Sequence, residues 1–101
     1  MDPNKICPIC GYDQLDEGPF TPEGCPTYEI CPCCGFEYGF DDESEGLTYS
    51  QFRQRWIARG YHWFHKEETP AGWGKTMMER QLSNAKLANA QSRYVANIKH
   101  P

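Results

Sequence analysis

Two copies of one short cysteine motif are the clearest chemical signal in this sequence. Each copy reads Cys-Pro-X-Cys-Gly, at residues 7–11 and 31–35. Two thiolates three positions apart can bind one ion when the backbone between them turns tightly, and a proline presets that turn. The glycine accepts a positive φ, which lets backbone N–H groups point at sulfur. The motifs predict one structural zinc ion held by Cys7, Cys10, Cys31 and Cys34.

The two remaining cysteines, Cys25 and Cys33, fall outside this pattern. Cys33 could replace its neighbour Cys34 as a ligand, but the symmetry of the two motifs favours Cys34. Cys25 lies in a loop rich in proline and glycine at 16–27, and we expect it to be a free thiol. Disulfides are the alternative for six cysteines, but they would leave the repeated motif unexplained. A metal site agrees with a reducing, cytoplasmic compartment.

Iron is the alternative metal, because two Cys-X-X-Cys-Gly motifs also resemble rubredoxin, an electron carrier that binds one iron with four thiolates. The helical second half of the chain is foreign to rubredoxin, which favours zinc. A redox-active dithiol at Cys7 and Cys10 is disfavoured, since Gly11 closes a turn and opens no helix. No nucleophile with a neighbouring base stands out in the sequence. We therefore expect no enzyme activity and no catalytic residues.

Short aromatic segments at 28–30 and 36–40 flank the second motif, and the latter alternates with the period of a strand. They predict a hairpin. The expected fold is a small α+β protein, with an N-terminal zinc ribbon of rubredoxin-like β-hairpins over 1–47 and two helices over 48–101 packed on or beside it. The halves should form one compact domain, with a loose tail after about residue 97.

Two capping boxes predict where these helices begin. The first, at 48–51, opens a helix to about Arg59, and Gly60 takes the stop position. Its apolar stripe, assigned to the core, comprises Tyr49, Phe52, Trp56 and Ile57. The second, at 76–79, opens a helix to about Ala96. His62 and His65, between the helices, have ligand-like spacing, but their aromatic neighbours favour packing over a second metal.

Charge divides the chain into an acidic and a basic half. Up to residue 47 there are eleven acidic residues and one lysine, and beyond it nine basic and three acidic residues. The acidic cluster that ends the first half predicts a surface for a basic protein partner, with two aromatic anchors beside it. The residues of this predicted surface are Asp41, Asp42, Glu43, Glu45, Tyr38 and Phe40. The alternative is a solvated turn that favours the dipole of the following helix.

Nucleic acid is a disfavoured partner, because the acidic half would repel phosphates. Arginines of the first helix could still contact a phosphate backbone, so a nucleic-acid-binding or transcription-associated zinc ribbon is the alternative function. No stretch approaches the roughly 20 apolar residues of a membrane span. The first residues lack the pattern of a secretory signal. We expect a cytoplasmic protein without a membrane partner, and the oligomeric state stays open.

Beyond the motifs, the chain resembles small bacterial cysteine-rich proteins of the CPCC type, a largely uncharacterised family. The resemblance rests on C-P-I-C-G-Y at 7–12, Y-E-I-C-P-C-C-G-F-E-Y-G-F-D-D at 28–42, Y-S-Q-F-R-Q-R-W-I-A-R-G at 49–60 and P-A-G-W at 70–73. It implies a zinc-ribbon fold. Similar proteins occur beside bacterial toxin systems, which implies a non-catalytic immunity protein that neutralises a cognate toxin, such as a nuclease.

Overall fold

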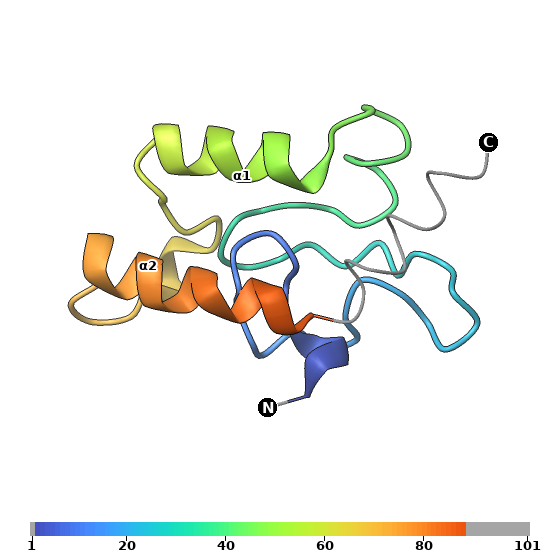
Figure 1. Ribbon diagram of the computed structural model, residues 1–101, viewed down its shortest axis with the longest axis horizontal. Coiled ribbons are helices and arrows are strands. Elements are labelled where there is room, and N and C mark those ends of the chain that lie inside the picture. The colour runs from blue at the N-terminus through green and yellow to red at the C-terminus, as the bar shows by residue number, and fades with distance from the viewer. Residues whose placement is uncertain (1, 89–101) are drawn as a thin grey trace.

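Two short α-helices lie on opposite sides of the loops that contain the cysteine motifs. A computed structural model describes residues 2–88. The helices are α1 (Tyr49–Ala58) and α2 (Lys75–Leu82), and three 3₁₀ helices accompany them, η1 (Pro3–Lys5), η2 (Lys66–Glu68) and η3 (Ser83–Leu87). α1 and α2 run in opposite directions along the molecule, with the loops of the first half between them (Figure 1).

The predicted α+β zinc ribbon with β-hairpins is wrong. Residues 2–88 contain no strand and no sheet, and pairing there is limited to two isolated bridges, Phe20 with Pro26 and Ile30 with Glu37. The first half of the chain consists instead of turns and irregular loops.

Backbone conformation explains why the predicted hairpin at 28–40 does not become a ladder. Tyr28 has a φ of 61° and Gly39 a φ of 103°, both far from the extended region. Between them, the Tyr38 N–H donates to the Glu29 carbonyl while the Tyr38 carbonyl accepts from the Tyr28 N–H. Tyr28 and Glu29 thus both pair with Tyr38, as two residues face one in a β-bulge, and regular strand pairing stops there.

The first predicted helix is confirmed, including its capping box. The Thr48 hydroxyl accepts the Gln51 N–H at 3.0 Å, and the Gln51 side chain accepts the Thr48 N–H at 3.0 Å. α1 ends at Ala58, before Gly60 with its φ of 99°. Of the predicted apolar stripe, Tyr49 and Trp56 are buried, and Phe52 and Ile57 are half-buried and pack against the same core.

The second predicted helix is present, but it begins about two residues earlier than predicted and ends earlier. It starts at Lys75 after Gly74, without a side-chain cap, so the predicted capping box at 76–79 does not form. It ends at Leu82 and continues as η3 to Leu87. The predicted extension to Ala96 and the tail after 97 lie outside the described residues. No helix within residues 2–88 is long and apolar enough to cross a membrane.

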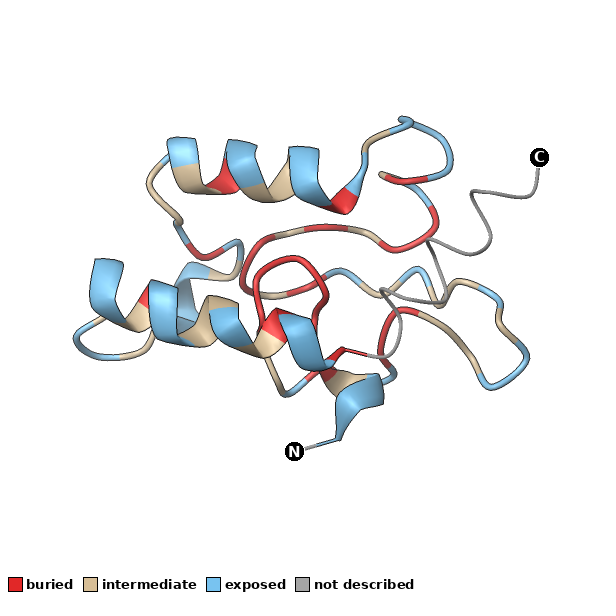
Figure 2. Cartoon of the chain, viewed as in Figure 1, coloured by how far each residue is buried: buried red, intermediate tan, exposed pale blue. Residues whose placement is uncertain are grey.

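The core is formed mainly by loops and is completed by one face of each helix. The buried segments in Figure 2 include the two cysteine loops, which lie between α1 and α2. Phe36 stands at the centre of an aromatic group, with the rings of Tyr38, Tyr49 and Phe52 centred 4.9–5.5 Å from its own. Met78 closes the core from α2. A core assembled from loops has few helix or sheet hydrogen bonds of its own, so it needs a further source of stability.

Candidate metal centre

The two cysteine motifs adopt the same backbone fold. In the first, the Cys7 N–H donates to the Tyr12 carbonyl and the Gly11 N–H to the Cys7 carbonyl, at 2.7 and 3.0 Å. In the second, the equivalent bonds join residues 31 to 36 and 35 to 31, at 3.0 and 2.9 Å. The closing glycines have φ values of 85° and 84°. The sequence repeat is therefore a structural repeat, in which each glycine adopts a conformation that other residues rarely accept.

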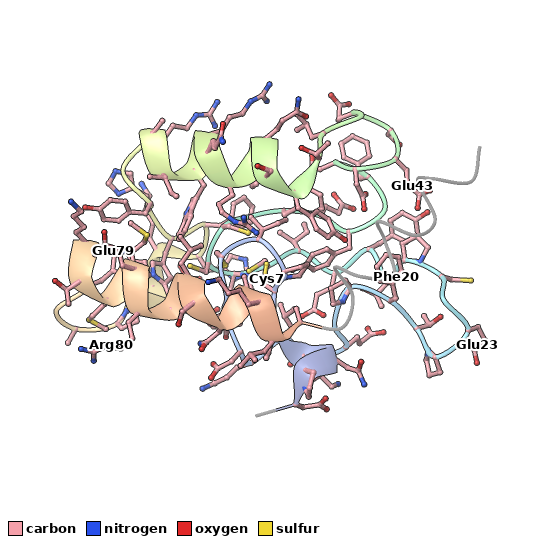
Figure 3. The ribbon with its side chains drawn as sticks, in the orientation of Figure 1. Cys7, Phe20, Glu23, Glu43, Glu79 and Arg80 are labelled. Atoms are coloured by element: carbon pink, nitrogen blue, oxygen red, sulfur yellow. The ribbon has the colours of Figure 1, made fainter. Side chains whose placement is uncertain are left out.

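The four predicted ligands lie together in the interior. The sulfur atoms of Cys7, Cys10, Cys31 and Cys34 all lie within 4.8 Å of one another, and all four residues are buried. Across the two motifs, Sγ of Cys7 lies 3.8 Å from that of Cys34, and Sγ of Cys10 lies 3.7 Å from that of Cys31. Figure 3 places Cys7 near the centre of the molecule. These four cysteines could hold a metal ion.

The sulfur spacing fits a tetrahedral ion. With metal–sulfur bonds of about 2.3 Å, a tetrahedron sets its ligands about 3.8 Å apart, and the two cross-motif distances match that edge. The set is also complete, since four thiolates leave no open position for a substrate or water. The Ile9 N–H lies 3.4 Å from Sγ of Cys7 and donates to it, as backbone amides do to the thiolate ligands of such sites.

The thiols differ in how readily they lose their protons. Burial raises the pKa of the Cys10, Cys31 and Cys34 thiols, that of Cys10 and Cys34 most strongly. Burial would also raise the pKa of Cys7, but hydrogen bonds from the other three thiols outweigh it and hold this pKa well below its usual value. Burial of these three thiols therefore disfavours their charged forms while no cation is present. A divalent cation supplies the positive charge that lets their protons leave.

Tyr38 lies beside this cluster, and its burial contradicts the prediction that it is a surface anchor for a partner. Its side chain is fully buried, and its hydroxyl has no hydrogen-bond partner of ordinary geometry within residues 2–88. Burial and the negative charges of the neighbouring cysteines raise the pKa of Tyr38 well above its usual value. The hydroxyl thus stays protonated and is available as a donor to a thiolate.

The two helices hold the first motif in place. From α1, the Arg53 guanidinium donates to the carbonyls of Pro8 and Ile9, at 2.7 Å each. From α2, the Gln81 amide donates to the Cys10 carbonyl at 3.1 Å. α2 also packs so closely on Gly11 that a Cβ there would lie 1.9 Å from the Gln81 carbonyl oxygen. The sequence does not predict Arg53 and Gln81 as site residues, because partners 44 and 71 positions apart leave no local pattern.

The second motif is held by the segment between the helices. The Phe64 N–H donates to the Cys33 carbonyl and the His65 N–H to the Pro32 carbonyl, both at 2.9 Å. The Phe64 ring packs against Gly35, where a Cβ would lie 2.8 Å from it. Each motif is therefore clamped by a later part of the chain. The ligand geometry depends on the whole fold as well as on the motifs.

The other two cysteines stand apart from the cluster. Cys33 is buried, but its sulfur accepts the Gln81 amide at 3.3 Å and does not join the four. Cys25 is an exposed free thiol. Cys34, and not its neighbour, thus completes the set.

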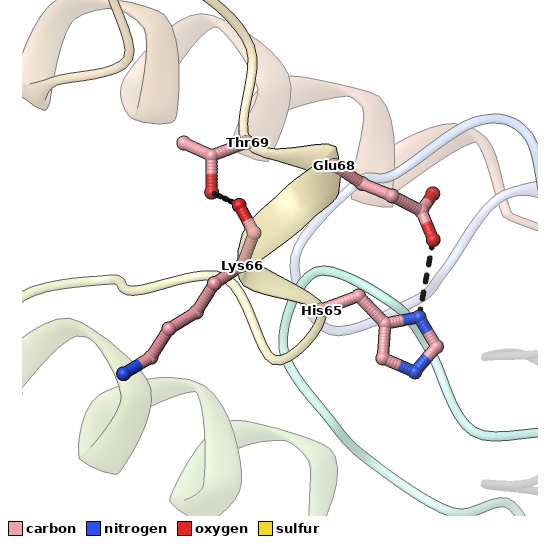
Figure 4. Close-up of polar contacts among 4 residues, drawn as sticks. All are labelled: His65, Lys66, Glu68 and Thr69. Carbon is pink, nitrogen blue, oxygen red and sulfur yellow. Dashed lines mark hydrogen bonds and ion pairs between the residues drawn. The ribbon is translucent and has the colours of Figure 1, made fainter.

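A second group of potential metal ligands lies on η2 and at its N-cap. His65, Glu67 and Glu68 are close enough to share an ion. The His65 ring lies 3.1 Å from the Glu68 carboxylate in an exposed pair (Figure 4). His62, the other histidine of the sequence pattern, is not part of this group. Exposed groups of this kind are common without a metal, and the pair is explained by its own hydrogen bond.

The predicted acidic surface divides into structural and exposed residues. Asp42 is buried, and its carboxylate accepts the N–H groups of Gly39 and Glu43 at 2.7 and 3.0 Å. Asp41 likewise accepts the Glu37 N–H at 2.8 Å. These two aspartates stabilise the turn, so they are poor candidates for partner contacts. Glu43, Glu45 and Phe40 are exposed, and Glu43 lies at one end of the molecule with Glu23 (Figure 3).

Comparisons with known proteins give two relatives, both from Bacillus subtilis (strain 168). The chain is 31% identical over 78 residues to the uncharacterized protein YoaQ, a match that covers 63% of this chain and 66% of YoaQ. It is 30% identical over 79 residues to the uncharacterized protein YozI, a match that covers 63% of this chain and 65% of YozI. The chain thus spans slightly less than two thirds of either relative.

Comparisons with family models and solved structures assign this chain to no family and to no known fold. No protein-family model matches the chain, so the resemblance to CPCC-type proteins stays a prediction. No solved structure matches it either. This chain is a small cysteine-rich protein that is similar to uncharacterised Bacillus proteins. Its four clustered cysteines could bind a metal ion.

Proposed function

We propose that Cys7, Cys10, Cys31 and Cys34 bind one zinc ion in a structural, non-catalytic site. The observation that supports this most directly is the 3.7–3.8 Å spacing of their buried sulfur atoms. A structural site closes at four protein ligands, whereas a catalytic zinc keeps one position for water. Burial of all four thiols fits the closed type.

Metal analysis of the purified protein tests this proposal. We expect about one zinc per chain and a colourless solution. An iron tetrathiolate site, the rubredoxin-like alternative, would give a red protein with iron in place of zinc. A preparation that contains neither metal after expression with both available would contradict the proposed site.

Within the same proposal, the metal-stabilised fold presents a surface to another protein. Three large apolar side chains of residues 28–40 remain exposed, namely Tyr28, Ile30 and Phe40, at 57%, 38% and 45%. Glu43 and Glu45 are exposed beside them in sequence. Aromatic anchors with nearby charges are the composition that interfaces favour. The excess of acidic groups favours a basic partner through faster, steered association.

The most specific partner that we propose is a basic toxin, which would make this chain an immunity protein. The resemblance to proteins found beside toxin systems motivates this choice, and a toxin that acts on nucleic acid has the basic cleft that an acidic surface complements. A nucleic-acid-binding role is the alternative. The acidic first half disfavours it, because phosphates would be repelled.

Charge reversal at Glu43 tests whether the acidic surface binds a basic toxin. The experiment measures association of the chain with the product of a toxin gene adjacent to its own, and Glu43→Lys should lower the association rate about tenfold and reduce its salt dependence. Glu79→Lys is the matched control, because Glu79 is exposed at the opposite end of the molecule (Figure 3). Equal effects of both substitutions, or salt-dependent binding to nucleic acid without a protein partner, would overturn the immunity proposal.

A further inference from the structure

A cavity of about 350 Å³ lies between α1 and the segment that follows it. α1 contributes Phe52, Arg55 and Trp56 to its wall, and the C-cap residue of α1, Arg59, also lines it. Residues 62–64, Lys66 and Cys34 contribute the rest. The volume falls in the range of small-molecule sites. The cavity shares no residue with the acidic surface, so a ligand bound in it does not depend on the basic protein partner.

The charged side chains that line this cavity are all positive. Arg55, Arg59 and Lys66 line it, and no carboxylate does. Within residues 2–88 their side chains form no hydrogen bond or ion pair. The nearby Glu68 is engaged with His65, and Lys66 projects away from that pair (Figure 4). In a chain with a net charge of −4, three such cations around one cavity favour an anion.

Arg53 shows the contrast on the same helix. Its guanidinium is used by the fold, since it donates to two carbonyls of the first cysteine motif. Arg55 and Arg59 are exposed and make no such contact. Their guanidinium groups remain free to donate to a phosphate in the bidentate manner that arginine favours.

The rest of the wall is aromatic. Phe64 is 55% exposed, yet its backbone is held by the Cys33 carbonyl and its ring by Gly35. It therefore offers a positioned ring face on which a base can stack. Trp63, a further wall residue, is 5% exposed and has a buried indole N–H without a hydrogen-bond partner within residues 2–88. Its ring packs edge-on against Tyr12 and Trp73, which fixes this part of the wall.

We propose that this cavity binds a nucleoside monophosphate unit, with the phosphate contacted by Arg55, Arg59 and Lys66 and the base stacked on Phe64. Cations alone would suit any anion, and aromatic rings alone would suit any apolar ligand. Their combination around one cavity of this size selects a ligand that has a phosphate joined to a planar ring. The unit can come from a free nucleotide or from the end of a single strand.

Titration calorimetry with the metal-loaded protein tests this proposal, with adenosine 5′-monophosphate as the probe at low salt. We expect saturable binding that weakens as salt rises. Inorganic phosphate and adenosine, titrated separately, should each bind at least tenfold more weakly. A 5′-phosphorylated hexadeoxythymidylate distinguishes the source: tighter binding than the mononucleotide assigns the site to strand ends, and weaker binding assigns it to free nucleotides.

Three variants locate the binding. Arg55→Gln and Arg59→Gln should each weaken binding of adenosine 5′-monophosphate about tenfold, and Phe64→Ala should do so by a similar factor. Arg80→Gln, an exposed arginine of α2 that does not line the cavity, should leave the affinity within about twofold. Because the arginine variants replace exposed side chains, they keep the test valid even if Phe64→Ala fails to fold.

The contrary results are equally definite. Absence of binding at millimolar nucleotide would overturn the proposal. So would phosphate or adenosine binding as tightly as the nucleotide, or equal losses in the Arg55, Arg59 and Arg80 variants.

Discussion

Replacing Cys10 by serine is expected to abolish metal binding and to unfold the protein. Cys10 is fully buried and its sulfur lies 3.7 Å from that of Cys31, so the variant loses one of four ligands in the interior. Structural zinc sites contribute on the order of 10–16 kcal/mol in apparent free energy, whereas domains are stable by about 5–15 kcal/mol. Circular dichroism and metal content, measured together, check both losses.

Cys25→Ser is the matched control. Cys25 is an exposed free thiol, so this change should leave the metal content unaltered and the stability within about 0.5 kcal/mol. Exhaustive chelation of the unaltered protein should reproduce the unfolding of the Cys10 variant. A chain that keeps its tertiary structure after complete removal of metal would falsify a structural role for the site.

The second large effect is expected at Trp56, which joins α1 to the loops. Its side chain is 6% exposed, and its indole N–H donates to the His62 carbonyl at 2.9 Å. Trp56→Ala removes a buried aromatic ring and leaves that carbonyl without its donor, and should cost roughly 3–5 kcal/mol. Chemical denaturation of the metal-loaded protein measures this change in the free energy of unfolding.

Two substitutions separate the causes of that loss. Trp56→Phe keeps most of the ring but removes the N–H, and should cost about 1–3 kcal/mol. Arg55→Ala, one position earlier and exposed, should stay within about 0.5 kcal/mol. A larger cost at Arg55 than at Trp56 would mean that the opposite face of α1 packs on the core.

Local patterns in the sequence were sufficient to identify the four clustered cysteines and α1. The ligands of one motif are three positions apart, so the turn that brings them together needs only the proline and glycine of that motif. The capping box likewise involves residues three positions apart, and both of its hydrogen bonds form. Features of this kind can be predicted from the sequence because the interacting groups are neighbours in the chain.

Local patterns were misleading where one residue type has two possible environments. Alternation at 36–40 matches a half-buried strand, but Gly39 and the bulge at Tyr38 end the pairing. The sequence pattern predicts a surface position for Asp42 and Tyr38, and both are buried. An aspartate in an acidic run can cap backbone N–H groups or face solvent. Only the surrounding packing decides between them.

Tertiary structure alone decided how the candidate metal centre is enclosed. Arg53 and Gln81 reach the first motif across 44 and 71 residues, and Phe64 holds the second. The positions of Arg55, Arg59 and Lys66 around one cavity follow in the same way from how α1 packs beside the segment after it. By itself, the sequence determined which residues can bind a metal, because thiolate chemistry and short spacing are local. The fold decided which side chains surround them, because contacts between distant segments depend on the packing of the whole core.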